Sequence, residues 1–448
     1  MIGSHFYLNG KKTVLRGTHD FSHYHGDPVI CPGDRNIAMD LLLHKKMGAN
    51  CSRWPSDIRL HSKKIAQYCD QFGLMLSWAG FFEVWTQYSE AETLLPRDVR
   101  EMIKSLRNHP SIVIWEMGDE ALQLDGDYRR FRYHEFMIRL VAREDPTRPI
   151  IPNGCYCNEL VDLIKERPYT GERPDAEDYS ERRRRVLEEY PVFAHRQAVW
   201  DLHKFPYFSP SASEFKYIDE VSRILGGCKP TVYTEFGCDA LPNPANVADI
   251  YGGFRWKENA YIKINRDDFD MRLYGKLIKQ EDWRETQAFQ AVFVCGLIAR
   301  LRQHPGAYAA YYFATMIDIW TCYWGAADIK GNCKLGYYAA KSHMAPLFVS
   351  ALHGGVTAGI ADGLNITASN YGDRIRGATL NISVRSGDGR LALEKEIRNI
   401  DIDGDVAVTA IAHMELSGLR AGLYGVEYRV TGRDGESLGR MLEMAFFD

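Results

Sequence analysis

Residues 112–120 read Ile-Val-Ile-Trp-Glu-Met-Gly-Asp-Glu, and residues 231–237 read Thr-Val-Tyr-Thr-Glu-Phe-Gly. Each segment is a short apolar run that ends in a carboxylate. Strands of a parallel sheet are buried on both faces and therefore appear as continuous apolar runs. In a (β/α)8 barrel the carboxyl ends of these strands carry the active-site residues. The two segments predict two barrel strands that bring Glu120 and Glu235 to one rim.

Short apolar segments alternate with amphipathic segments over most of the chain, a pattern typical of parallel βα units. Between residues 14 and 350 there is room for about eight strand–helix pairs, the number that closes a TIM barrel. We predict a (β/α)8 catalytic barrel over residues 1–350. Residues 6–16 are predicted to form a hairpin with Asn9 and Gly10 at the turn, and its second strand runs into the polar residues 17–20 as the first barrel strand. The other candidate strands lie at residues 49–54, 74–78, 112–117, 149–152, 198–202, 231–234 and 307–314.

The pattern of apolar and polar residues changes after Ser350. Short segments of alternating polarity follow, and Gly, Asp and Asn residues separate them. They lie at residues 364–368, 379–384, 406–411 and 425–430. This pattern predicts a small all-β, immunoglobulin-like sandwich over residues 351–448.

Composition excludes several classes of protein. The chain has 55 basic and 59 acidic residues and a net charge of −4, which argues against a nucleic-acid partner. A run of about 18 apolar residues is absent, so no membrane partner is expected. The first residues lack the apolar region of a secretory signal, which predicts a cytoplasmic protein, or a secreted or periplasmic one if a leader was removed. The ten cysteines are scattered and show no zinc spacing, and no nucleotide-binding motif is present. We therefore predict neither a metal nor a cofactor.

Two glutamates at strand ends suit the hydrolysis of a glycosidic bond. Retaining glycosidases use two carboxyl groups about 5–5.5 Å apart, one as the nucleophile and one as the acid/base. We assign Glu120 as the acid/base and Glu235 as the nucleophile. A single glutamate at a strand end is more often a structural ion-pair partner, but two such residues at the ends of two strands favour catalysis.

Several segments resemble glycoside hydrolase family 2. Residues 106–120 contain Arg-Asn-His-Pro-Ser before a strand ending in Asp-Glu, and the family has the same motif before a strand ending in Asn-Glu. Residues 234–242 resemble the nucleophile segment of its β-mannosidase branch, and residues 334–350 resemble the link from that barrel to a β-sandwich. Asn50, Arg53 and Trp54 match its second strand. The resemblance covers roughly residues 6–350 and points to the β-mannosidase and exo-β-glucosaminidase branch.

The resemblance implies a role for each matching residue. Glu120 and Glu235 take the acid/base and nucleophile positions, and Arg53 takes the position of the arginine that keeps the nucleophile ionised. A structural ion pair within the barrel is compatible with this role of Arg53. Further residues are expected to bind the sugar: His203 and Tyr207 one strand before the nucleophile, Asp318 and Trp320 at the eighth strand, and His19, Asp20 and Trp78 at other strand ends.

Two departures from the family pattern leave the substrate open. Asp119 replaces the asparagine that contacts the sugar 2-hydroxyl, and an ionised carboxylate accepts hydrogen bonds but donates none. Asp119 therefore suits a 2-hydroxyl donor or a charged 2-amino group, so β-mannosidase-like and β-glucosaminidase-like specificities both remain. Family members usually carry β domains before the barrel, whereas this chain begins almost at the barrel, which weakens the expectation of exo action.

The expected activity is a retaining β-glycosidase that hydrolyses terminal β-linked sugars through a covalent glycosyl-enzyme. Two alternatives remain open. The first is a catalytically degenerate barrel that only binds carbohydrate, and the second is an endo-acting hydrolase or transglycosylase. In each case the partner is a carbohydrate, and a homo-oligomer is not excluded.

Overall fold

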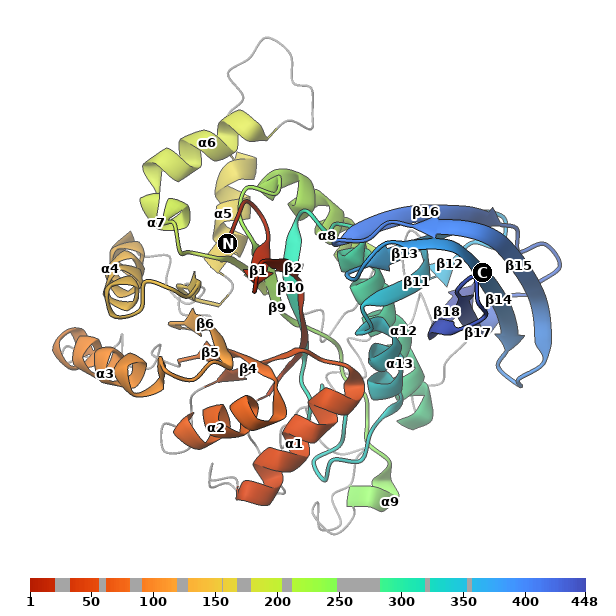
Figure 1. The fold of residues 1–448 in the computed structure, drawn as a ribbon, viewed down its shortest axis with the longest axis horizontal. Coiled ribbons are helices and arrows are strands. Elements are labelled where there is room, and N and C mark those ends of the chain that lie inside the picture. The colour runs from red at the N-terminus through yellow and green to blue at the C-terminus, as the bar shows by residue number, and fades with distance from the viewer. Residues whose placement is uncertain are drawn as a thin grey trace.

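The computed structural model describes residues 1–20, 33–55, 62–80, 91–118, 128–154, 156–166, 179–203, 212–247, 283–318, 323–352 and 357–448. Figure 1 shows a barrel with helices around it and a β-sandwich beside it. A hairpin of β1 (Phe6–Leu8) and β2 (Lys11–Thr13) precedes the barrel. Its turn residues Asn9 and Gly10 have φ of 52° and 80°, values that an Asn-Gly turn accommodates.

Eight parallel strands form one sheet in the order β7-β6-β5-β4-β3-β10-β9-β8. The outer two strands meet through a parallel bridge between Ile150 and Ala198, where the Val199 amide donates to the Ile150 carbonyl at 2.8 Å. The sheet is therefore closed, and the predicted (β/α)8 barrel is confirmed. The strands are β3 (Leu15–His19), β4 (Cys51–Pro55), β5 (Met75–Ala79), β6 (Ile112–Glu116), β7 (Ile150–Ile151), β8 (Trp200–His203), β9 (Thr231–Phe236) and β10 (Tyr308–Ala314).

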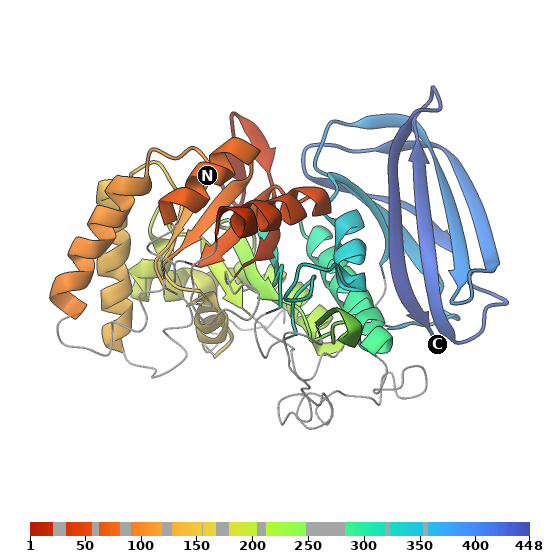
Figure 2. The same cartoon turned by 90° about the horizontal axis from the view of Figure 1, so that it is seen from below.

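Helices cover the outside of this barrel (Figures 1 and 2). The first of them ends at Gly48, whose φ of 89° is a left-handed conformation that glycine adopts without strain. None of the described helices is long and apolar enough to cross a bilayer. The helices are α1 (Asp34–Met47), α2 (Ser62–Phe72), α3 (Ala91–Leu106), α4 (Tyr128–Glu144), α5 (Tyr156–Glu166), α6 (Ser180–Glu189), α7 (Pro191–Ala194), α8 (Ala212–Leu225), α9 (Pro244–Val247), α12 (Trp283–Arg302) and α13 (Leu335–His343).

Side chains of the barrel strands alternate between two hydrophobic clusters, because successive residues of a strand point to opposite faces. The outer cluster lies between strands and helices and includes Trp54, Trp78 and Trp115. The inner cluster fills the barrel and includes Leu15, Cys51, Ile114, Val232 and Tyr312. Arg53 stands two residues after Cys51, and Glu116 stands two residues after Ile114, so both share the inward direction of these inner residues. The alternation therefore places Arg53 and Glu116 inside the barrel, near its carboxyl-terminal end.

The C-terminal part is an all-β sandwich, as predicted. Its core holds buried side chains from both sheets, among them Val349, Ile366, Ile382 and Val426. Residue 350, the predicted domain boundary, lies within β11. One sheet has the order β11-β13-β16 and the other β12-β18-β17-β14-β15. The strands are β11 (Leu347–Leu352), β12 (Thr357–Ala358), β13 (Leu364–Asn370), β14 (Ile375–Ser386), β15 (Leu391–Ile402), β16 (Ala407–Met414), β17 (Gly422–Thr431) and β18 (Ser437–Phe447).

A buried arginine joins the barrel to the sandwich, which packs against α12 and α13 (Figure 2). Arg302, the last residue of α12, is fully buried, and its guanidinium lies 4.1 Å from the centre of the Tyr371 ring. It donates to Ser369 Oγ at 2.5 Å and to four backbone carbonyls at 2.8–3.2 Å, those of His343, Ala345, Pro346 and Ser369. These acceptors come from the link and from β13, so one side chain holds both domains.

We expect Arg302→Met to destabilise the protein by about 3 kcal/mol, because the shape is largely kept while five buried acceptors lose their donor. The measurement is the urea midpoint followed by tryptophan fluorescence. The control is Arg390→Met, since the Arg390 side chain is 86% exposed and is ion-paired with the partly exposed Asp388. That variant should lie within about 0.5 kcal/mol of the parent. Equal midpoints for both variants would contradict a junction role of Arg302.

Candidate active site

Four polar side chains meet inside the carboxyl-terminal end of the barrel. They are His19 at the end of β3, Arg53 on β4, Glu116 at the end of β6 and Glu235 on β9, and we call them the rim cluster. The exposed fraction is 0% for the first three residues and 3% for Glu235. Buried charges persist only when they are paired and hydrogen-bonded, so the contacts within the cluster determine its chemistry.

Arg53 is the centre of the rim cluster. Its Nε donates to Glu116 Oε2 at 2.9 Å and its Nη2 donates to Glu116 Oε1, which is the two-point fork of a strong arginine–carboxylate pair. Its Nη1 donates to Glu235 Oε1 and lies 2.9 Å from His19 Nδ1. One guanidinium is therefore shared by two carboxylates from two different strands.

His19 is the second partner of Glu235. Its Nδ1 lies 2.9 Å from Glu235 Oε1. A protonated Nδ1 donates to that oxygen, whereas an unprotonated Nδ1 accepts from Arg53. In either state the carboxylate of Glu235 accepts from Arg53 and is oriented by it. An oriented carboxylate with slight exposure at a barrel rim can serve as a nucleophile or a general base.

A β-bulge turns Glu235 into the barrel. Along β9, Val232 belongs to the inner cluster and Tyr233 to the outer cluster, so strict alternation would send Glu235 outwards. The register with both neighbouring strands shifts after Tyr233 by one extra residue on β9. As a result Glu235 contacts Arg53 inside the barrel while Phe236 packs outside. Bulges next to active sites commonly redirect a side chain in this way.

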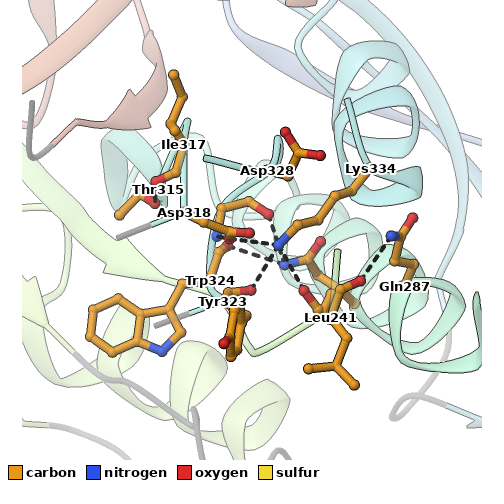
Figure 3. A network of polar contacts seen from close by, with 12 residues as sticks. Leu241, Gln287, Thr315, Ile317, Asp318, Tyr323, Trp324, Asp328 and Lys334 are labelled. Carbon is orange, nitrogen blue, oxygen red and sulfur yellow. Dashed lines mark hydrogen bonds and ion pairs between the residues drawn. The ribbon is translucent and has the colours of Figure 1, made fainter. Parts of the chain in front are cut away.

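Asp318 lies in a separate buried network, which Figure 3 shows. Its Oδ1 accepts from Lys334 Nζ at 2.5 Å and from the Gly325 amide at 2.9 Å. Lys334 also donates to the carbonyls of Ala240 at 2.7 Å and Tyr323 at 3.1 Å. Burial raises the pKa of Asp318 to about 7, against the opposing effect of Lys334. The Asp318–Lys334 pair thus ties the loop after β10 to the loop after β9, the strand that carries Glu235.

The remaining predicted residues divide into four groups. Asp20 is buried beside the rim cluster, and its amide donates to the Arg53 carbonyl at 2.9 Å. Trp78 does not join this cluster, because its side chain points outwards from β5 and is buried in the outer cluster. Its Nε1 donates to Met102 Sδ of α3 at 3.4 Å. His203 ends β8 opposite Glu235 in the strand register, and its side chain is not described. Four predicted residues lie outside the described residues: Asp119, Glu120, Tyr207 and Trp320.

Sequence reasoning missed Glu116, although a signal was present. Glu116 follows Ile112 and Ile114 at intervals of two, and these isoleucines are buried on β6. A carboxylate in phase with buried residues of an apolar strand must be paired, since an isolated buried charge is very costly. Among the described residues no group of three or more His, Cys, Asp or Glu side chains is arranged to hold a metal ion.

Comparison with known proteins identifies the barrel. The family model for glycosyl hydrolases family 2, TIM barrel domain, matches residues 1–310. The chain belongs to glycosyl hydrolase family 2. The resemblance found in the strand motifs is thereby confirmed.

The curated relatives match only parts of this chain. A β-galactosidase of Klebsiella pneumoniae is 30% identical over 159 residues, 33% of this chain and 14% of the relative. A putative β-glucuronidase of Formosa agariphila is 29% identical over 209 residues, 43% of this chain and 24% of the relative. The matched regions therefore span less than a quarter of the length of each of these relatives.

Solved structures share the fold over the whole chain. The exo-chitosanase of Amycolatopsis orientalis is 14% identical with a TM-score of 0.65, covering 98% of this chain and 49% of its own. The β-D-mannosidase of Dictyoglomus thermophilum is 15% identical with a TM-score of 0.63, covering 99% of this chain and 51% of its own. At these identities the likeness concerns the fold, and this chain corresponds to about half of each structure.

Proposed function

We propose that the protein is a retaining β-glycosidase with Glu235 as the nucleophile and Glu120 as the acid/base. The observation that carries the proposal is the position of Glu235, a nearly buried carboxylate at a barrel rim that is bound by Arg53 and His19. Arginine favours the ionised form of a carboxylate, which is the form that attacks. Glu120 follows the end of β6 by four residues in the sequence, and the family resemblance assigns it the acid/base position.

The proposed reaction has two steps. In the first, a carboxylate oxygen of Glu235 bonds to the anomeric carbon while the bond to the leaving oxygen breaks, and that oxygen takes a proton from Glu120. In the second, a water molecule attacks the anomeric carbon, Glu120 takes its proton, and the ester bond electrons return to Glu235. Glu235 is thus negative, then neutral, then negative again.

The names of the similar proteins support β-linked sugars as the substrate class. They include a β-galactosidase, a putative β-glucuronidase, an exo-chitosanase and a β-D-mannosidase. These names cover several sugars, so the choice among them rests on Asp119. Its carboxylate suits a charged 2-amino group, and we propose a glucosaminide-like or mannoside-like substrate. We further propose that His203, Tyr207 and Trp320 contact the sugar, with Asp318 fixing the loop that leads to Trp320.

A screen of 4-nitrophenyl β-glycosides tests this function. The panel contains the mannoside, glucosaminide, galactoside, glucuronide and glucoside, with Glu235→Gln as the blank. We expect release of 4-nitrophenol above the blank, strongest for the glucosaminide or the mannoside. Proton NMR should show the β-anomer as the first product, because two inversions at one carbon give retention.

Three other outcomes would contradict the proposal in different ways. An α-anomer as the first product would exclude the covalent route. Sugar binding by calorimetry without cleavage of any glycoside would indicate a degenerate binding barrel. Cleavage of oligosaccharides only at internal bonds would indicate an endo-acting enzyme.

A further inference from the structure

We propose that Glu116 is a positioning residue that keeps Arg53 paired through the whole catalytic cycle and tunes its hold on Glu235. The inference rests on the proposed function, because it concerns the change of charge on Glu235 between the two steps. Within the rim cluster the guanidinium of Arg53 binds two carboxylates, those of Glu116 and Glu235. In the proposed reaction Glu235 reacts and Glu116 does not.

The geometry separates the two carboxylates by function. Glu116 takes the Nε and Nη2 edge of Arg53 through both of its oxygens, while Glu235 is bound through Nη1 alone. A two-point fork fixes the plane of a guanidinium, whereas a single contact does not. Glu116 therefore fixes the orientation of Arg53, and this orientation aims Nη1 at Glu235 and His19.

The surroundings keep Glu116 out of the chemistry. It is fully buried at the end of β6, in phase with Ile114 of the inner cluster. Burial, more than any other cause, raises the pKa of Tyr312 on β10, and the charge of Glu116 adds to this effect, so the phenol stays neutral. Among the described residues Arg53 therefore pairs with Glu116, and the neutral phenol of Tyr312 lies near it, with its oxygen 3.4 Å from Cys51 Sγ.

The charge of the cluster changes during the reaction. When Glu235 becomes a neutral ester, Arg53 loses one of the two carboxylate partners described above. The two-point pair with Glu116 does not take part in the reaction and keeps the buried guanidinium compensated, which matters because an uncompensated buried charge costs several kcal/mol. In the free enzyme the same sharing weakens the attraction of Arg53 for Glu235, which leaves the nucleophile more reactive.

Removing the charge of Glu116 should therefore affect the two steps in opposite directions. In Glu116→Gln the full charge of Arg53 acts on Glu235, which holds the free carboxylate more tightly and slows its attack. The same charge stabilises the carboxylate as it leaves the ester and does not slow that step. We expect kcat/KM, which reports the first step, to fall by about tenfold or more. We expect kcat for a 2,4-dinitrophenyl glycoside, where breakdown of the ester limits turnover, to stay the same or rise.

Glu116→Asp is the matched control, because it keeps the charge and shortens the side chain by one methylene. In Glu116→Asp the ratio of kcat/KM to kcat for the 2,4-dinitrophenyl glycoside should stay within about threefold of the parent ratio. A threefold change corresponds to about 0.7 kcal/mol of activation free energy. Equal losses of both constants in Glu116→Gln, or no loss in either, would overturn the positioning role. Full activity of Glu235→Gln would instead refute the proposed function, so the two failures are distinguishable.

A second measurement uses the unaltered chain and decides the question if Glu116→Gln does not fold. The glycosyl-enzyme is trapped with a 2,4-dinitrophenyl 2-deoxy-2-fluoro-β-glycoside of the sugar that the screen selects, and its crystal structure is determined. The fork between Glu116 and Arg53 should be intact while Glu235 is esterified. An Arg53 that has turned away from Glu116 would overturn the inference.

Discussion

The Glu235→Gln variant is expected to lose turnover of aryl β-glycosides by about four orders of magnitude or more, as removal of an enzyme nucleophile commonly does. Glutamine has nearly the same shape but a neutral amide that does not attack the anomeric carbon. The fold should be kept, because Arg53 retains its two-point contact with Glu116. The measurement is kcat on the preferred 4-nitrophenyl glycoside, together with the thermal midpoint.

Glu101→Gln provides the control for a general effect of losing one carboxylate. The Glu101 side chain is 67% exposed on α3 and pairs with Lys104 at 3.3 Å. An exposed pair of this kind contributes about 0–1 kcal/mol to stability, and it lies on a barrel helix rather than at the rim. This variant should keep the parent activity. Turnover by Glu235→Gln at the level of the control would exclude Glu235 as the nucleophile.

The Glu120→Ala variant is expected to lose about 10²–10⁴-fold in turnover of substrates with poor leaving groups, the range attributed to general acid–base catalysis. Substrates with a 2,4-dinitrophenyl leaving group need little protonation and should still form the glycosyl-enzyme. Azide should then restore release of the leaving group, because this small anion attacks the ester without help from a base. The expected product is the β-glycosyl azide, detected by mass spectrometry and NMR.

Asp119→Ala discriminates between Asp119 and Glu120, two carboxylates that are consecutive in the sequence. If Glu120 is the acid/base, azide should not rescue Asp119→Ala, whose defect should appear mainly in KM. Rescue of Asp119→Ala, with no rescue of Glu120→Ala, would move the acid/base role to Asp119. The comparison needs no assumption about which sugar is bound.

The predicted strands of the barrel agree closely with the observed ones. The candidate strand at 112–117 corresponds to β6 (Ile112–Glu116), and the candidate strand at 307–314 corresponds to β10 (Tyr308–Ala314). Parallel strands buried on both faces leave a strong local signal, which is their continuous apolar character. The position of Arg53 next to Glu235 agrees with the role that the family resemblance implies.

Residue orientation was harder to predict than strand position. Trp78 is an aromatic residue near a rim, which suggested a sugar contact, but it faces the helices. Asp318 was expected to bind the sugar, and its pairing with Lys334, a residue of the segment before α13, was not predicted. Both outcomes depend on the phase of a strand or on a partner far along the chain, which the local pattern leaves open.

The sequence by itself determined the closed barrel, the following sandwich and the strand ends at which carboxylates stand, because periodicity and apolar runs are local properties of the chain. Only the tertiary structure decided that Glu235 faces inwards, since a one-residue bulge on β9 reverses its direction. It also decided that Glu116 and Glu235 share Arg53. Such sharing requires three strands to meet in space, and burial away from water then makes the pairing of these charges obligatory.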